Sequence, residues 1–326
     1  LIKEADYVVI MGHRMSDLDA IGAAEGVLRI CKICDVPAVI AVKRDATLAG
    51  SLIDALCRAG QKDDFIDPKD ALPINSKRTL CVVVDTYQVG LVESKEILEK
   101  CGKVAVIDHH RKGVGYIQNP DLVCHEPYSS SASELVTELL QYVGDRDDKP
   151  NRVEAEGLLS GILLDTQDFT LHTGVRTFEA AAALRRYGAE TERVRQLFDV
   201  TMVEYAAKAE LVERARMYRN CAISVGGEIA PEARVAIAQA ANDLLRIQGV
   251  DASFVAVQVG TGVNISARSL GAVNVQVIME ALGGGGHQTM AAAQLKHITP
   301  EAARARIEGA IDKYYASQKK GDVEGK

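Results

Sequence analysis

Four short apolar runs rich in β-branched residues alternate with helical patterns in the first half of the chain, and this alternation restricts the possible folds most strongly. The runs are Tyr7–Met11, Ala38–Val42, Leu80–Val84 and Val104–Ile107. Helical spacing occurs between them, at Ala20–Ile30 and Glu93–Lys100. Strands that alternate with helices favour a doubly wound, mostly parallel sheet. The first half therefore predicts an α/β domain.

The second half predicts a helical stretch followed by a smaller domain. Helical patterns occur at Ala155–Leu164 and, with a break near Gly188, from Thr177 to Tyr218. Strand patterns and two helical patterns follow, with strands at Ala222–Val225, Arg234–Ala238, Phe254–Val259 and Val263–Arg268, one helix near Asn242 and a last helix that ends in Gly283–His287. We therefore expect a first domain over residues 1–195, a helical linker over 196–220 and a smaller α/β domain with a mixed sheet over 221–326.

Composition excludes several classes of protein. Of the 326 residues, 47% are hydrophobic and 25% are charged, which is typical of a globular protein. The chain has no run of about 18 apolar residues that could span a bilayer. The net charge of −7 argues against a general nucleic-acid-binding surface, which is normally basic. An anionic small substrate is still compatible with this charge, because bound divalent metals invert the local potential.

The cysteines and the first residue concern the cellular context. Seven cysteines, an odd number, occur without an export signal, which indicates reduced cytosolic thiols. Cys31 and Cys34 form a lone CxxC in an apolar helical stretch, where core packing is favoured over zinc binding. Because the chain begins with Leu1 and enters a strand almost at once, we expect a cytoplasmic fragment of a longer protein, whose missing part has room for a membrane anchor.

Polar side chains follow three of the predicted strands and close the helix over Ala155–Leu164. They are His13, Asp17, Asp19, Asp85, Asp108, His109, His110 and Asp165. In an open α/β sheet, ligands bind beyond the carboxyl ends of the strands, where these side chains would meet. Carboxylates mixed with imidazoles suit Mn²⁺, Mg²⁺ or Fe²⁺. A shared carboxylate can hold two ions about 3.5–4 Å apart, the spacing of two-metal phosphoester hydrolases.

Each of these residues also has an ordinary structural explanation. Asp17 and Asp19 can cap a helix and interact with its dipole. A lone aspartate after a strand is commonly a turn residue. Ser129–Ser133, ahead of Glu134, is also expected to be a helix cap. The convergence of four distant segments on one sheet edge nevertheless favours a metal site.

A run of four glycines near the C-terminus suggests a second kind of site. Gly283–Gly286 permits positive φ angles and close approach of a phosphate or base, and His287 follows the run. Arg268, at the end of a predicted strand, can bind phosphate through two hydrogen bonds. The run is not a P-loop, because no Lys-Ser/Thr pair follows it. A flexible interdomain loop is the alternative.

Together these motifs resemble the DHH phosphoesterase superfamily. The N-terminal motifs are His13-x-x-x-Asp17-x-Asp19, Val84-Asp85-Thr86, Asp108-His109-His110 and Leu164-Asp165-Thr166. Asn264-Ile-Ser-Ala-Arg268-Ser and Gly283–His287 resemble the DHH-associated C-terminal domain. Ser266–Leu270 and Asn274–Leu282 are most similar to the corresponding segments of bacterial cyclic di-AMP phosphodiesterases, which are commonly membrane-anchored.

The resemblance implies two divalent metal ions, with Mn²⁺ expected. One ion would be held by His13, Asp17 and Asp85. The second would be held by Asp19, Asp85, His109 and Asp165. His110 would face the scissile phosphate, and Asp108 would support the site. The sequence leaves open which of His109 and His110 points inward.

The resemblance also implies a substrate and a reaction. The first domain would be catalytic, and the second would bind nucleotide through Arg268, Gly284, Gly285, Gly286 and His287. We expect a hydroxide that bridges the metals to attack cyclic di-AMP, which gives linear 5′-pApA. We also expect a homodimer that binds no long nucleic acid.

Two alternatives remain open. The chain could cleave short oligoribonucleotides. A RecJ-type exonuclease that acts on long single strands is disfavoured, because it would favour a basic, aromatic-lined channel, and this chain has 5% aromatic residues and no Trp. It could also be a non-catalytic module that binds a dinucleotide, although such a module is typically expected to lack a metal ligand.

Overall fold

The computed structural model describes residues 1–326 except 72–76, 112–114, 146–147, 230–234, 287 and 325–326, and only the backbone of 319–324. The chain forms two compact units, Leu1–Asp199 and Val200–Lys326. Helix α8 (Met202–Glu213) and strand β7 (Arg216–Tyr218) lie in the segment expected to be a linker, and they group with the second unit. The predicted domain limits stay predictions.

A six-stranded parallel sheet forms the centre of the first unit. Its strands are β1 (Tyr7–Met11), β2 (Ala38–Ala41), β3 (Phe65–Ile66), β4 (Thr79–Val84), β5 (Lys103–Asp108) and β6 (Leu122–His125). They lie in the order β3-β2-β1-β4-β5-β6, and every neighbouring pair is parallel. The chain runs outward from β1 in one direction and from β4 in the other, so the strand order reverses between them. Such a switch point is where open α/β sheets bind ligands.

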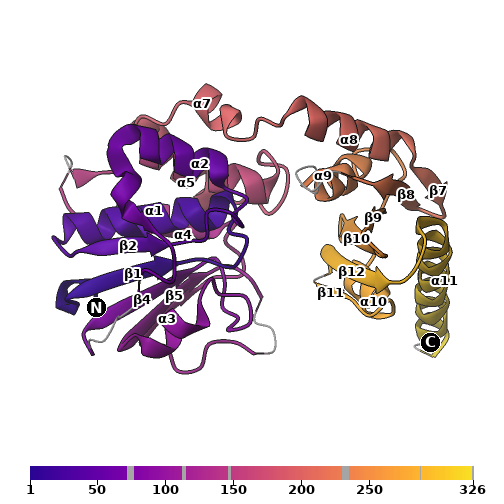
Figure 1. Ribbon diagram of the computed structural model, residues 1–326, viewed down its shortest axis with the longest axis horizontal. Coiled ribbons are helices and arrows are strands. Elements are labelled where there is room, and N and C mark those ends of the chain that lie inside the picture. The colour runs from indigo at the N-terminus through magenta and orange to yellow at the C-terminus, as the bar shows by residue number, and fades with distance from the viewer. Residues whose placement is uncertain (72–76, 112–114, 146–147, 230–234, 287, 325–326) are drawn as a thin grey trace. The chain divides into compact units, whose positions relative to one another are not determined.

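Helices cover both faces of this sheet, which confirms the predicted doubly wound fold (Figure 1). They are α1 (Leu18–Ile33), α2 (Gly50–Leu56), α3 (Lys95–Lys100), α4 (Ala132–Leu140), α5 (Arg152–Thr166), α6 (Val175–Arg186) and α7 (Thr191–Gln196). Strand side chains alternate between the faces. Val8 and Ile10 therefore lie in the core with α1, α4 and α5, whereas Val9 and Met11 lie in the core with α3.

The second unit is built on a mixed sheet, as predicted. Its further elements are β8 (Cys221–Glu228), α9 (Val235–Leu244), β9 (Ala252–Val259), β10 (Gly262–Ser269), α10 (Val275–Glu280), β11 (Gly285–Gly286), β12 (Met290–Lys296) and α11 (Pro300–Glu324). The strand order is β11-β12-β10-β9-β8-β7. Only β8 and β9 pair in parallel among the described strands of this sheet.

Two local predictions in this unit are wrong. The segment predicted as a strand at Arg234–Ala238 begins helix α9 at Val235, and residue 234 lies outside the described residues. Helical spacing of its buried residues, which include Ala236, Ala240 and Leu244, outweighs the β-branched Val and Ile of this short run. The last predicted helix ends at Glu280 rather than in the glycines, of which Gly285 and Gly286 form β11.

Two expectations from composition can be compared with the structure. Within the described ranges, no helix is both long enough and apolar enough to cross a bilayer. All seven cysteines are free. Cys31 is buried in the core of the first unit and Cys34 packs against that core, which confirms that this CxxC is a packing element.

Candidate metal centre

The sheet brings three polar segments to one edge. His13 lies two residues beyond the end of β1, Asp85 directly follows β4, and Asp108 is the last residue of β5. These strands are neighbours and parallel, so their carboxyl ends coincide. The backbone φ of Asp85 is +58°, an uncommon value for a residue other than glycine and one often associated with functional sites.

Asp17 and Asp19 come from the start of α1. Asp17 is the N-cap of this helix, and its Oδ1 accepts hydrogen bonds from the amides of Asp19 and Ala20, both at 3.1 Å. The capping explanation for Asp17 is therefore confirmed. The same Oδ1 lies 3.7 Å from Nε2 of His13, so capping does not remove Asp17 from the polar cluster.

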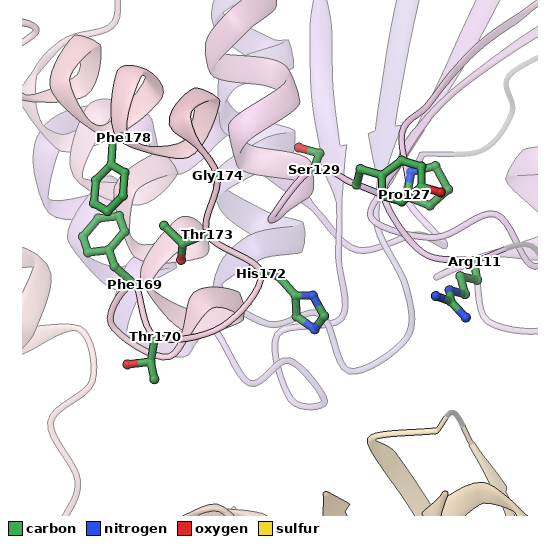
Figure 2. Close-up of a pocket in the computed structure, with 10 residues that line it drawn as sticks. Arg111, Pro127, Ser129, Phe169, Thr170, His172, Thr173, Gly174 and Phe178 are labelled. Atoms are coloured by element: carbon green, nitrogen blue, oxygen red, sulfur yellow. The ribbon is translucent and has the colours of Figure 1, made fainter. Parts of the chain in front are cut away.

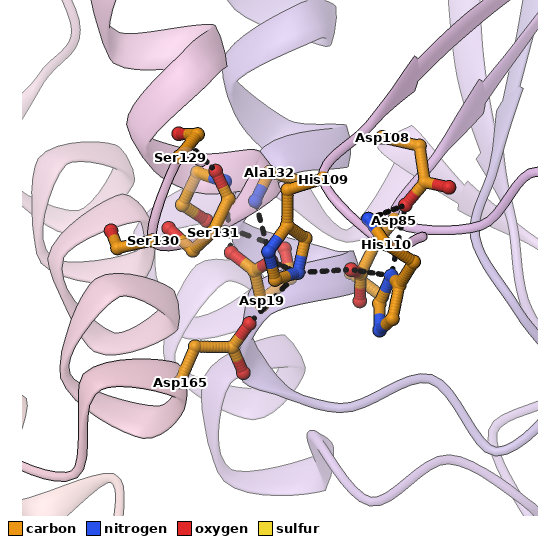
Figure 3. Close-up of polar contacts among 12 residues, drawn as sticks. Asp19, Asp85, Asp108, His109, His110, Ser129, Ser130, Ser131, Ala132 and Asp165 are labelled. Atoms are coloured by element: carbon orange, nitrogen blue, oxygen red, sulfur yellow. Dashed lines mark hydrogen bonds and ion pairs between the residues drawn. The ribbon is translucent and has the colours of Figure 1, made fainter. Parts of the chain in front are cut away.

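Asp19 is fully buried and is held by the N-terminus of α4. Its Oδ2 accepts a hydrogen bond from the amide of Ala132, and its Oδ1 accepts one from the amide of Ser133, both at 2.8 Å (Figure 3). Amides at a helix N-terminus stabilise a carboxylate. Ser131 is the N-cap of α4, as expected, but the contact of this helix with Asp19 was not predicted.

Asp165 comes from the last turn of α5, and His109 links it to the sheet edge. Nε2 of His109 lies 3.0 Å from Oδ2 of Asp165, 3.4 Å from Oδ1 of Asp85 and 3.9 Å from Oδ2 of Asp19 (Figure 3). His109 thus points into the cluster of carboxylates. This geometry resolves the orientation that the sequence left open for His109.

His110 lies beside His109, with ring centroids 4.4 Å apart. Its Nδ1 lies 2.9 Å from Oδ1 of buried Asp108 and 3.6 Å from Oδ1 of Asp85. Oδ1 of Asp108 also accepts the backbone amide of His110 at 3.1 Å. Asp108 therefore fixes both the backbone and the ring of His110.

The ligand atoms fall into two main groups that share one residue. His13, Asp17 and Asp85 form one group, and Asp19, Asp85, His109 and Asp165 form the other; within each group the atoms lie within 4.8 Å of one another. Asp85 presents Oδ2 to His13 at 3.3 Å and Oδ1 to His109. A third set, Asp85 with His109 and His110, overlaps the second. This is the sharing of one carboxylate that a two-metal site requires.

Electrostatics in the cluster also fit a cation site. Burial, and then repulsion from Asp85 and Asp165, raises the pKa of Asp19 well above its usual value. Burial also raises the pKa of Asp165. Burial opposes the charge on His13, but the carboxylates of Asp17 and Asp85 outweigh this effect and raise its pKa to about 11.

The chemistry of the donors gives a further test of fit. Asp85 Oδ1 and His109 Nε2 are buried, and neither forms a hydrogen bond of good geometry with a described residue. Buried polar atoms without such partners are rare in proteins and call for an explanation such as an ion. Carboxylates with imidazoles, and no thiolate, suit Mn²⁺ and Mg²⁺. The residues present therefore fit two divalent cations.

The predicted nucleotide-binding residues lie in the second unit. Arg268, on β10, donates from Nη1 to Ser266 Oγ and to the Ala267 carbonyl, at 3.1 and 3.0 Å. Its buried Nε has no hydrogen-bond partner among the described residues. Burial lowers the pKa of Arg268, as expected for a guanidinium without a counter-ion.

Strand packing by itself requires glycine at two positions of the glycine run. A Cβ at Gly284 would collide with the carbonyl oxygen of Ala292, and one at Gly286 would collide with the backbone of Ala291. Gly285 pairs with Ala292 in the β11–β12 ladder. His287 lies outside the described residues. The roles of these residues in substrate binding stay predictions.

Family comparisons agree with the motifs. Residues 7–162 match the DHH family, N-terminal domain, and residues 230–315 match the DHHA1 domain. The chain carries a DHH family N-terminal domain followed by a DHHA1 domain.

Two curated proteins are similar to this DHH chain over almost its whole length. The chain is 45% identical to cyclic-di-AMP phosphodiesterase GdpP of Geobacillus thermodenitrificans, over 98% of this chain and 49% of that protein. It is 41% identical to cyclic-di-AMP phosphodiesterase PdeA of Listeria monocytogenes, with the same coverage. The chain thus spans about half the length of these relatives.

Solved structures agree with the DHH fold. An exopolyphosphatase-related protein from Bacteroides fragilis matches with a TM-score of 0.81 and 21% identity, over 98% of this chain and 95% of that chain. RecJ from Thermus thermophilus, in complex with Mn²⁺, matches with a TM-score of 0.53 and 15% identity, over 96% of this chain and 54% of that chain. At these identities the similarity concerns the fold alone.

Proposed function

We propose that this DHH chain is a metal-dependent phosphodiesterase that hydrolyses cyclic di-AMP to linear 5′-pApA. The observation that carries the proposal is the convergence of two carboxylate–imidazole groups that share Asp85. The names of the relatives that are 41–45% identical support cyclic di-AMP as the substrate.

Two Mn²⁺ ions are the proposed cofactors. His13, Asp17 and Asp85 would hold one ion, and Asp19, Asp85, His109 and Asp165 would hold the other. When bound, such ions lower the pKa of a coordinated water towards neutrality and offset negative charge on the phosphate. Asp85 connects the two groups of ligands, because its two oxygens face different histidines.

His110 is assigned to the scissile phosphate. Asp108 orients its ring through Nδ1, as the second group of a catalytic pair commonly orients the first. A positively charged imidazole at this place would stabilise the charge that develops on the phosphate in the transition state. Burial opposes the charge on His110, but Asp108 and then Asp85 raise its pKa above the usual value.

Arg268 is assigned to nucleotide binding, together with Gly284, Gly285, Gly286 and His287. The support is the buried Nε of its guanidinium, which has no partner among the described residues. A phosphate would supply the missing acceptor and the missing negative charge.

A substrate panel tests the proposal. Purified chain with Mn²⁺ would be incubated separately with cyclic di-AMP, cyclic di-GMP and pApA, and the products would be separated by chromatography. We expect cyclic di-AMP to be consumed fastest, with pApA as the first product. No hydrolysis of any cyclic dinucleotide would reject the proposal.

A second candidate is a phosphodiesterase for short oligoribonucleotides. The chain is 27% identical to the bifunctional oligoribonuclease and PAP phosphatase NrnA of Thermus thermophilus, over 93% of this chain and 89% of that protein. The same panel separates the two candidates, because this activity would consume pApA faster than cyclic di-AMP. A non-catalytic binding module is disfavoured, since all six proposed metal ligands are present and grouped.

A further inference from the structure

A cavity of about 860 Å³ lies in the first unit and is lined by several residues that are close in sequence to the proposed metal ligands (Figure 2). Its walls continue directly from the metal-site segments. Arg111 follows His110, and Phe169 lies on the loop that follows Asp165 and the end of α5. Ser129 lines the cavity and belongs to the loop that leads into α4, whose amides hold Asp19 (Figures 2 and 3).

Aromatic side chains form one end of this cavity. Phe169 and Phe178 are stacked, with ring centroids 5.3 Å apart and an interplanar angle of 24° (Figure 2). Phe178 is 56% exposed, and Tyr128, which also lines the cavity, is 95% exposed. Exposed aromatic side chains that line a cavity are typical of a ligand-binding site.

The polar lining favours an anionic ligand. Arg111 and His172 contribute nitrogen donors, and Ser129, Thr170 and Thr173 contribute hydroxyls. The described residues that line the cavity include no acidic side chain, although the chain as a whole has a net charge of −7. Arg111 lies opposite the Phe169–Phe178 pair in Figure 2. A ligand with a planar ring at one end and a phosphate at the other matches this arrangement.

The loop that carries Phe169 has an uncommon backbone conformation. Gln167, Asp168, Phe169 and His172 have φ angles of +47°, +57°, +62° and +48°. Such angles outside glycine persist only when surrounding contacts enforce them, and they cluster at ligand clamps. Thr166 enforces them here, because its Oγ1 accepts the amide of Phe169 at 2.9 Å and its carbonyl accepts the amide of Leu171 at 2.7 Å. Thr166 directly follows Asp165, so the loop is fixed relative to the metal centre.

We propose that this cavity binds the half of the dinucleotide that is not cleaved. The purine base stacks on Phe178, and the phosphate of the same nucleotide lies against Arg111. A volume of about 860 Å³ lies in the range of small-ligand sites and is sufficient for one nucleotide. The proposal rests on the proposed function, and it makes Phe178 and Arg111 determinants of substrate specificity.

Phe178→Ala and Arg111→Ala test this proposal. Both side chains are exposed, so both variants should fold. Matched controls are Tyr142→Ala, an aromatic residue that is 89% exposed, and Arg186→Ala, an exposed arginine on α6; neither lines the cavity. For Phe178→Ala we expect the KM for cyclic di-AMP to rise at least about fivefold, as for the loss of one base–aromatic stack. Metal content, measured by elemental analysis, should equal that of the wild type, and the controls should keep the wild-type KM.

Binding of simple probes separates the base from the phosphate. Calorimetry with adenosine 5′-monophosphate and with ribose 5-phosphate would use the full chain loaded with Mn²⁺. Phe178→Ala should weaken the binding of adenosine 5′-monophosphate only, whereas Arg111→Ala should weaken the binding of both probes. If the wild type cleaves cyclic di-AMP and Phe178→Ala keeps its KM, the cavity proposal fails while the proposed function stands. If the wild type cleaves no cyclic dinucleotide, the proposed function fails. If Phe178→Ala also binds adenosine 5′-monophosphate as tightly as the wild type does, the cavity proposal fails as well.

Discussion

At the scale of single residues, Asp85 occupies the centre of the proposed site. Its Oδ2 lies 3.3 Å from His13 and its Oδ1 lies 3.4 Å from His109. Burial opposes its ionisation, but these histidines lower its pKa below the usual range for an aspartate. Each oxygen therefore faces a different group of ligand atoms, and among the described residues no other one belongs to both the His13 group and the Asp19 group.

Asp85→Ala should consequently remove both metals, whereas Asp17→Ala should weaken only one. Elemental analysis after equilibration with limiting Mn²⁺ would report the number of ions per chain. We expect fewer than one ion in Asp85→Ala and about one in Asp17→Ala, since a bridging ligand contributes to both sites. Two tightly held ions in Asp85→Ala would show that Asp85 is not the bridge.

Glu25 gives a prediction that is independent of the metals. This residue of α1 is buried, and burial, together with repulsion from Glu154, raises its pKa to about 8. The folded protein therefore holds a proton on Glu25 that the unfolded chain releases near its ordinary pKa of 4.5. The resulting stability is fully present below pH 4.5 and is lost as the pH rises towards 8.

Glu25→Gln should remove this loss of stability at high pH, because the amide of glutamine stays neutral. Urea unfolding from pH 5 to 9 would compare the variant with the wild type. Relative to the wild type, the variant should gain on the order of a few kcal/mol across this range. A constant difference in unfolding free energy at every pH would contradict the assignment.

At the scale of elements, the site depends on how closely α5 packs against α1. Gly161 of α5 permits this approach, because a Cβ there would lie 2.6 Å from Oδ1 of Asp19 and closer still to Oγ of Ser133. Gly157, one turn earlier, is a matched control, because the atoms nearest to a Cβ there belong to the flexible side chain of Leu52, the first at 3.1 Å.

Gly161→Ala should destabilise the fold and disturb Asp19, although alanine is the better helix former by about 1 kcal/mol. Overpacking of this kind is destabilising by about 1–3 kcal/mol. Urea unfolding and metal analysis should show losses in Gly161→Ala and much smaller losses in Gly157→Ala. Equal behaviour of the two variants would mean that α5 can move away without affecting Asp19.

Elements also explain what the sequence could and could not predict. Asp85 and His109 follow strand ends, so strand patterns and parallel pairing were sufficient to place them. The hydrogen bonds from α4 to Asp19 join residues 113 and 114 positions apart, and no local pattern reports such a contact. Phe178 was missed because an aromatic residue on a helix normally indicates core packing. The strand predicted at Arg234–Ala238 was wrong because its run was too short to separate the two periodicities.

At the scale of the whole molecule, the proposed metal ligands and the proposed phosphate contact of Arg268 belong to different compact units. The proposed metal ligands all lie in the first unit, and Arg268 lies in the second. Metal binding and the contribution of Arg268 should therefore respond separately to mutation.

Arg268→Ala should keep the wild-type metal content but lose activity on cyclic di-AMP. A charged hydrogen bond contributes about 1.5–3 kcal/mol, so a loss of at least tenfold in kcat/KM is expected. Hydrolysis of bis-p-nitrophenyl phosphate, which offers no nucleotide to bind, should fall much less, whereas His109→Ala should lose both activities. Depletion of metal in Arg268→Ala would overturn this division.

Two ions bound by the carboxylate–imidazole cluster are proposed to make this chain a cyclic di-AMP phosphodiesterase. The most direct measurement strips the protein with a chelator, adds Mn²⁺ back in steps and follows the conversion of cyclic di-AMP to pApA by chromatography. We expect no activity in the stripped protein and recovery that reaches its plateau at about two ions per chain. Full activity in the metal-free protein would contradict a role for the metals in catalysis.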